Sequence, residues 1–395
     1  MNFLSTRKVI GLTSYAFYFL LLLIATSCES DSLTPAIPSS QEGVEPTAVN
    51  QLGNLLIASE DGMFHFTDFD AFNAAINAVA PRTNKPFSEE ELRAVESRLG
   101  VATMQGAYLD KVDEFDREPD LSTDWFTDNS SVITSFDGGI SPVIRDFAVR
   151  TLINQEGRVK IGSDLFIFTK DHQMIIKNDP DDSAINKAII KASTDIEQGI
   201  FVQTGWQSTE DISTDKTCNG AFTRGCVAAE INSHRVRGYW GYDFIFNSTV
   251  NEICPGSNGD IFDDDDDEFC FPVSVTFTVT HRYIANAKVE DRGLFNRWTR
   301  DQTALSFTCG VRAQGLPGSG MGWTSSSDVH EIDVSWSAGP STITTVPVGT
   351  GGAPSDMARP LDYVTGGVDD ENISGLFCFD CCPWDCANSD ESDIP

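Results

Sequence analysis

Two stretches, VRGYWGYDFIF at 236–246 and VSVTFTVTHRYIA at 273–285, decide the fold of this chain. Bulky apolar residues recur at every second position in both. The polar residues between them lie on the opposite face, and in the first stretch and just before it these are Arg235, Arg237 and Asp243. A period of two is typical of a β-strand, and antiparallel sheets often keep one face in water. We therefore expect two antiparallel strands whose charged face is solvated.

The same alternation appears twice more, at 303–313 and at 330–336. Four such runs with many aromatic residues predict a β-sandwich or a curled sheet with one covered face. We expect five aromatic side chains from these runs to share one core: Trp240, Phe244, Phe277, Phe307 and Trp336.

Residues 51–156 have the apolar period of helices instead. Three helices are predicted, the first capped by Thr67, the second by Ser88 and ended by Gly100, and the third opened by Ser141-Pro142. We assign Phe69, Phe72 and Phe147 to the core.

From Gly157 the period changes again. Three short apolar runs, 159–161, 165–168 and 174–176, are separated by turn residues and predict a small meander, and 182–193 predicts a helix. The expected fold class is α+β: a helical N-terminal region (51–156) followed by an antiparallel β-rich domain (157–340). A tail rich in Gly, Pro, Ser and Cys follows at 341–395.

The first 28 residues combine a basic head (Arg7, Lys8), an apolar run and small residues before Cys28. This pattern is typical of an export signal. Residues 24–28, IATSC, resemble the lipobox of a bacterial lipoprotein signal. The resemblance implies cleavage after residue 27, lipidation of Cys28 and anchorage to the outer membrane, on its periplasmic or surface side. A plain membrane anchor is the alternative, but the apolar run is shorter than the ~20 residues that span a bilayer.

Residues 28–50 are rich in Ser, Pro and Glu and predict a flexible tether. Glu29 and Asp31 resemble the acidic tags that direct some lipoproteins to the cell surface. The formal charge of the chain is −32, which argues against nucleic acid as a partner.

Ten cysteines in an exported chain indicate disulfides rather than catalytic thiols. We expect Cys218–Cys226 and Cys254–Cys270 as local bridges. The tail cysteines Cys378, Cys381, Cys382 and Cys386 are further disulfide candidates, with zinc binding or free thiols as the alternatives. Lipidation of Cys28 leaves nine cysteines, an odd number, so one thiol is free, one pairs with another chain, or one of the expected bridges is wrong.

An acidic insert occupies 258–268, with six consecutive carboxylates from Asp263 to Glu268. The plainer interpretation is a solvated charged loop. The sharper one is a calcium site formed by Asp260, Asp263, Asp265 and Asp267, since calcium takes six to eight oxygen ligands. The spacing is not that of an EF-hand. No other cofactor is expected.

Motifs of zinc proteases and serine hydrolases are missing from the sequence, and the five histidines do not pair at helical spacing. The segments EGRVKIG at 156–162 with Phe168-Thr169, HRVRG at 234–238 and WTR at 298–300 resemble uncharacterised secreted lipoproteins of Gram-negative bacteria. That resemblance implies no activity. We expect a binding module for glycan, protein or divalent ion. A carboxylate-based extracellular hydrolase and an envelope structural protein are the alternatives.

Overall fold

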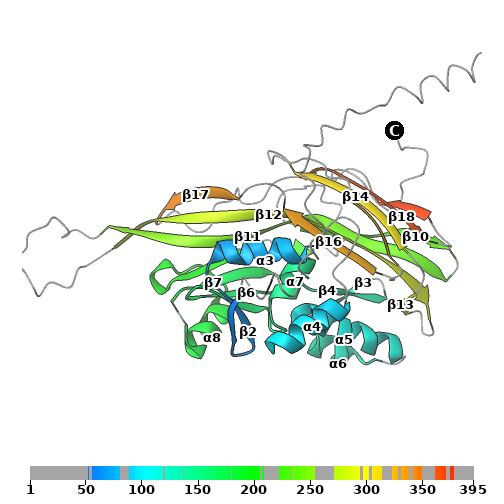
Figure 1. The fold of residues 1–395 in the computed structure, drawn as a ribbon, viewed down its shortest axis with the longest axis horizontal. Coiled ribbons are helices and arrows are strands. Elements are labelled where there is room, and N and C mark those ends of the chain that lie inside the picture. Colours follow the sequence, from blue (N-terminus) through cyan, green and yellow to red (C-terminus); the bar gives the residue numbers. More distant parts are fainter. Residues whose placement is uncertain are drawn as a thin grey trace, which may run out of the picture. The chain divides into compact units, whose positions relative to one another are not determined.

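A long antiparallel hairpin is the central element of the fold. The computed structural model describes residues 52, 56–80, 89–118, 121–136, 138–178, 180–204, 207–208, 222–231, 233–253, 271–293, 297–301, 305–313, 323–327, 331–337, 341–348, 361–370 and 374–377. The hairpin consists of β11 (His234–Ile253, 20 residues) and β12 (Phe271–Arg292, 22 residues). They pair from His234 opposite Asp291 to Ile253 opposite Phe271 (Figure 1). The alternating stretches thus predicted both strands, although the strands extend well beyond them.

The hairpin is the centre of a seven-stranded sheet. On the β11 side lie β10 (Phe222–Ile231) and β9 (Gln207–Ser208). The other edge of β12 pairs in succession with β17 (Thr342–Pro347), β16 (Glu331–Ser337) and β13 (Trp298–Arg300). All these pairings are antiparallel except β9 with β10.

A separate four-stranded sheet has the order β15-β14-β18-β19 and lies beside β10 and β12. Its strands are β14 (Leu305–Ala313), β15 (Trp323–Ser327), β18 (Leu361–Asp370) and β19 (Ser374–Phe377). The predicted strands at 303–313 and 330–336 are therefore present, as β14 and β16. Strands β17, β18 and β19 fall in the stretch that composition alone marked as an irregular tail.

The N-terminal half carries a six-stranded sheet with the order β1-β2-β5-β6-β7-β8. Its strands are β1 (Leu56–Glu60), β2 (Met63–Phe66), β5 (Arg158–Ile161), β6 (Asp164–Phe168), β7 (His172–Ile176) and β8 (Ile200–Thr204). The predicted meander is confirmed as β5–β7. The predicted helix at 182–193 is present as α8 (Asp182–Lys191), which packs Ile185 and Ala188 on this sheet. Gly157 has a φ of 78°, and a Cβ there would lie 2.2 Å from the Phe168 carbonyl oxygen, so the turn before β5 requires glycine.

The other helices are α3 (Phe69–Val79), α4 (Glu89–Leu99), α5 (Met104–Arg117), α6 (Thr123–Asp128) and α7 (Phe147–Leu152), with a hairpin of β3 (Ile133–Phe136) and β4 (Gly139–Pro142) before α7. Two of the predicted helix starts were wrong. Asp68, not Thr67, caps α3, accepting from the Ala71 N–H at 2.8 Å. Ser141-Pro142 ends β4, and Asp146 caps α7.

One apolar cluster joins these parts. It contains Phe69 and Phe72 of α3, Val149 of α7, and Phe244 and Phe277 of the hairpin, with Trp336 packed against it. Phe147 is also buried. The expectation of a shared aromatic core is thus confirmed for Phe244, Phe277 and Trp336, while the side chains of Trp240 and Phe307 lie outside the described part of the chain. None of the described helices has the length and apolar character needed to cross a membrane.

Candidate functional site

The charged face of the hairpin is buried, contrary to the sequence-based expectation of a solvated face. Arg235, Arg237 and Asp243 expose 0%, 2% and 5% of their surface. The prediction that these three residues share one face of the strand is confirmed. Helices α5 and α7 and the β3–β4 hairpin, which precede the hairpin by about a hundred residues, cover the face that carries these charges, as the contacts below show. Burial of charge is costly unless each charge has a partner, so the face is organised as a network of ion pairs.

Register places the partners opposite one another. Arg235 of β11 faces Glu290 of β12, and Arg237 faces Lys288. Glu290 accepts hydrogen bonds from Arg235 Nε at 2.9 Å and Arg237 Nε at 2.6 Å, and its other oxygen lies 3.2 Å from Lys288 Nζ. Burial raises the pKa of Glu290, but Arg237 and Lys288 outweigh burial and lower it to about 2. Arg237 also donates to the Ile140 carbonyl at 2.7 Å and so ties β4 to the sheet.

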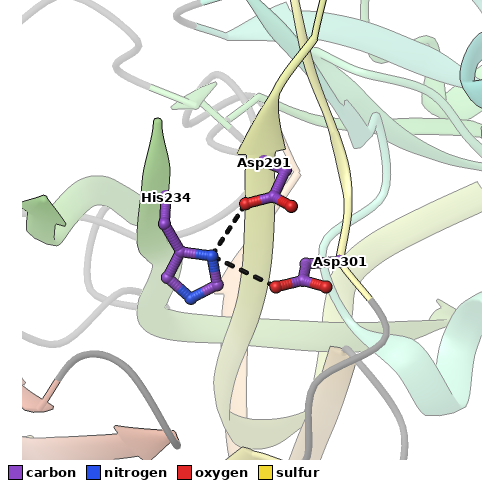
Figure 2. A group of neighbouring side chains, drawn as sticks. All are labelled: His234, Asp291 and Asp301. Carbon is purple, nitrogen blue, oxygen red and sulfur yellow. Dashed lines mark hydrogen bonds and ion pairs between the residues drawn. The ribbon is translucent and has the colours of Figure 1, made fainter. Parts of the chain in front are cut away.

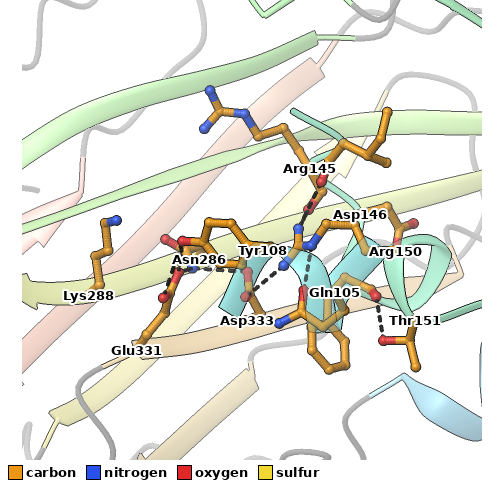
Figure 3. Close-up of polar contacts among 12 residues, drawn as sticks. Gln105, Tyr108, Arg145, Asp146, Arg150, Thr151, Asn286, Lys288, Glu331 and Asp333 are labelled. Atoms are coloured by element: carbon orange, nitrogen blue, oxygen red, sulfur yellow. Dashed lines mark hydrogen bonds and ion pairs between the residues drawn. The ribbon is translucent and has the colours of Figure 1, made fainter. Parts of the chain in front are cut away.

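Arg150 of α7 is the centre of a second group. It is fully buried and donates to Asp333 of β16 at 2.9 Å, to Gln105 of α5 at 2.6 Å and to the Ile144 carbonyl at 2.9 Å (Figure 3). Tyr239 donates to the other Asp333 oxygen at 2.8 Å. These bonds join two helices to β11 and β16.

Asn286 and Tyr108 complete this group. Asn286 donates to Glu331 at 2.8 Å and to Asp333 at 2.9 Å, and Tyr108 of α5 donates to Glu331 at 3.2 Å. Burial and the nearby Glu331 raise the pKa of the Tyr108 hydroxyl well above its usual range, so this phenol remains protonated and serves as a donor.

A third group surrounds Arg282 of β12. Its Nε donates to Asp146 and its Nη2 donates to Ser335 at 2.9 Å, while Nη1 is buried and has no hydrogen-bond partner among the described residues. Asp243 accepts from the Phe244 N–H at 2.7 Å. Burial and the neighbouring Asp146 raise the pKa of Asp243 well above its usual range.

The buried network is suited to holding the hairpin on the helices rather than to proton transfer. A general acid or base must reach substrate and change its protonation state near working pH. Asp146, Asp243, Asp333 and Glu290 are almost completely buried, which keeps these carboxyl groups away from a substrate. Glu290 in particular remains ionised far below neutral pH.

A second cluster lies at the corner of the seven-stranded sheet. His234 starts β11, Asp291 lies opposite it near the end of β12, and Asp301 directly follows β13. His234 Nδ1 lies 2.8 Å from Asp291 Oδ1 and 3.1 Å from Asp301 Oδ2 (Figure 2). The three ligand atoms all lie within 4.8 Å of one another. Exposed fractions of the side chains are 12% for His234, 22% for Asp301 and 53% for Asp291, so the cluster opens to solvent on one side.

The sequence did not predict this cluster. The five histidines show no metal-ligand spacing, and neither aspartate stands out among 59 acidic residues. The available signal was the alternation in β12. Extending the run at 273–285 to Arg292 would have included Asp291 in the strand, but only the register of the structure places it opposite His234.

The sites that the sequence did propose lie elsewhere. Cys28, the calcium candidates Asp260, Asp263, Asp265 and Asp267, and most of the cysteines lie outside the described residues. Cys226 lies in β10, opposite Gly238, but its predicted partner Cys218 is outside the described ranges. The lipidation site, the calcium site and both bridges therefore stay predictions.

Fold and clusters together define an α+β protein in which an antiparallel β-rich region is held on N-terminal helices by buried ion pairs. No protein-family model matches the chain, and a search of curated proteins finds no match. Among solved structures, a distant neighbour is the crystal structure of a DUF4848 family protein from Bacteroides thetaiotaomicron. The TM-score is 0.25 and the sequence identity 13%, over 81% of this chain and 98% of that chain.

Proposed function

We propose that this chain is an exported lipoprotein, held in the outer membrane by lipid on Cys28, whose β-rich region acts as a binding module outside the cytoplasm. The lipobox-like IATSC at 24–28 and the polar tether at 28–50 support the anchorage. The tether lets the folded part stand away from the membrane surface. The formal charge of the chain is −32, which argues against nucleic acids as partners.

The observation that favours binding over hydrolysis is that the clustered carboxylates are buried and form ion pairs. A glycoside hydrolase needs two carboxyl groups that flank its substrate, one of them able to give up a proton. In the described part of the chain, the dense group of carboxylates is buried and engaged by Arg150, Arg237 and Arg282. These ion pairs hold the helices on the sheet, which suits a module that presents a surface.

Metabolic labelling with a fatty-acid analogue tests the anchorage. The wild-type chain should carry label and fractionate with outer membranes, and Cys28→Ala should lose both properties. Cys218→Ala, which leaves the lipobox intact, is the matched control and should label like wild type. Equal labelling of wild type and Cys28→Ala would refute the anchorage.

Incubation of the purified full chain with insoluble extracellular polysaccharides separates binding from hydrolysis. A binding module that recognises glycan is retained on the polymer without releasing reducing ends. Steady release of reducing ends that a single Asp→Asn or Glu→Gln substitution abolishes would instead establish a carboxylate-based hydrolase.

A further inference from the structure

We propose that His234, Asp291 and Asp301 form a site for a divalent transition-metal ion of the zinc type. The inference builds on the proposed binding role and names the class of ligand. It starts from the convergence of the two aspartates on one atom, since both carboxylates lie within hydrogen-bonding distance of His234 Nδ1. A ring nitrogen carries at most one proton, so its single N–H cannot point straight at both carboxylates. A metal ion at the same position would bind both carboxylates and the imidazole together.

Distances agree with such an ion. With metal–ligand bonds of about 2.0–2.2 Å, the ligand atoms of a tetrahedral site are separated by roughly 3.3 Å. The two nitrogen–oxygen separations are 2.8 and 3.1 Å, so each would lengthen by only a few tenths of an ångström. Figure 2 shows the imidazole directing Nδ1 at both carboxylates, which come from separate segments of the chain.

The backbone holds the three ligands in place. Asp301 donates its N–H to the Val289 carbonyl at 3.1 Å, and Arg292 donates its N–H to the Ser233 carbonyl at 2.6 Å. Each bond ties a segment next to one ligand to a neighbouring strand. Asp291 pairs with His234 of β11 and with Thr299 of β13. Asp301 comes two residues after Thr299, so by alternation all three ligands lie on one face of the sheet. Because all three ligands lie on or beside paired strands, the site needs little rearrangement to bind an ion.

The donor set indicates which ion. One imidazole nitrogen suits zinc and its transition-metal neighbours, whereas calcium takes six to eight oxygen ligands. Three protein ligands leave a fourth position of a zinc ion open for water or an external group. Asp291 is 53% exposed, so solvent reaches the cluster. Such a site could bind an anionic group of a partner through the metal.

Calorimetric titration of the full chain in mild detergent with zinc chloride tests the proposal. Free thiols are first alkylated without reduction, so cysteines cannot contribute, and millimolar calcium occupies sites built from oxygen alone. We expect one zinc site in the wild type. His234→Gln and Asp301→Asn should each weaken zinc binding at least ~10-fold. Loss of a residue that only hydrogen-bonds to a metal ligand already costs that much, and these two are ligands themselves. His172→Gln, which replaces a partly exposed histidine of β7, is the matched control and should bind zinc like wild type.

Circular dichroism of each variant shows whether it is folded. If His234→Gln does not fold, Asp291→Asn keeps the test decisive, because its side chain is half exposed. Equal zinc affinity in wild type and the cluster variants, or no zinc binding by wild type, overturns the proposal. Fatty-acid labelling of Cys28 is independent of this titration, so failure of the metal site and failure of the anchorage are distinguishable.

Discussion

Asp146 and Arg282 form an ion pair in which both side chains are completely buried. One oxygen of Asp146 accepts from the Ala148 N–H at 2.9 Å and caps α7, and the other accepts from Arg282 Nε. A single carboxylate therefore both starts a helix and fixes it to the middle of β12, 136 residues further along the chain.

Arg282→Met should lower the free energy of unfolding by roughly 3–5 kcal/mol, because it leaves Asp146 buried without its counter-charge. Urea denaturation of the full chain measures the loss. The control is Lys191→Met, which breaks the more exposed pair with Asp195 and should cost less than about 1 kcal/mol. Similar small losses in both variants would contradict a buried pair.

Phe277→Ala should cost roughly 3–5 kcal/mol, since the ring is 3% exposed and contacts Phe201 and Phe246. Ile343→Ala in the neighbouring β17 is the control. Its side chain is 72% exposed, so its substitution should stay within about 0.5 kcal/mol. A change below about 0.5 kcal/mol for Phe277→Ala would place this ring outside the core.

Glu290 should make the protein sensitive to acid. Its pKa in the folded protein is about 2, below the usual value of about 4.3 in an unfolded chain. Its contribution is thus fully present above pH ~4.5 and is lost as the pH falls towards 2. A shift of this size corresponds to about 3 kcal/mol.

Wild type should therefore lose about 2.5 kcal/mol more stability between pH 5 and pH 2 than Glu290→Gln, as measured by urea unfolding at each pH, and the rest of the contribution is lost below pH 2. Glu252→Gln, which removes an exposed glutamate of β11, is the matched control variant. If Glu290→Gln keeps the full wild-type slope, then Glu290 is not held by Arg237 and Lys288.

Asp243 should have the opposite effect to Glu290 on how stability depends on pH. Its pKa is raised in the folded protein, so the unfolded chain releases the proton first and deprotonation favours unfolding as the pH rises above about 4. The free energy of unfolding of Asp243→Asn, relative to that of wild type, should therefore be higher at pH 7 than at pH 4. The difference should be about 1.4 kcal/mol for each unit by which the pKa of Asp243 is raised. Asparagine can still accept from the Phe244 N–H. A larger loss at pH 7 than at pH 4 would mean that Asp243 is ionised beside Arg282.

Local chemistry determined much of the fold. Alternation predicted β11, β12, β14 and β16, and turn residues predicted the meander of β5–β7, because a strand's two faces repeat every second residue wherever the strand lies. The stop at Gly100 was predicted for the same kind of reason: its φ is 67°, which glycine adopts without strain. Helix starts were less reliable. Asp68 and Thr67 are both good caps, and the choice between them depends on backbone angles.

Only the tertiary structure decided what covers each face and which residues meet. Arg235, Arg237 and Asp243 were expected in water because charged residues usually lie there. Their burial depends on helices and a hairpin that reach them from distant sequence positions, such as Arg150 pairing with Asp333, 183 residues later. His234, Asp291 and Asp301 likewise meet through strand register, and register is a long-range choice that no local pattern encodes. The sequence by itself predicted β5–β7, β11, β12, β14 and β16 and suggested an export signal, whereas packing between distant segments made the ion network and brought His234, Asp291 and Asp301 together.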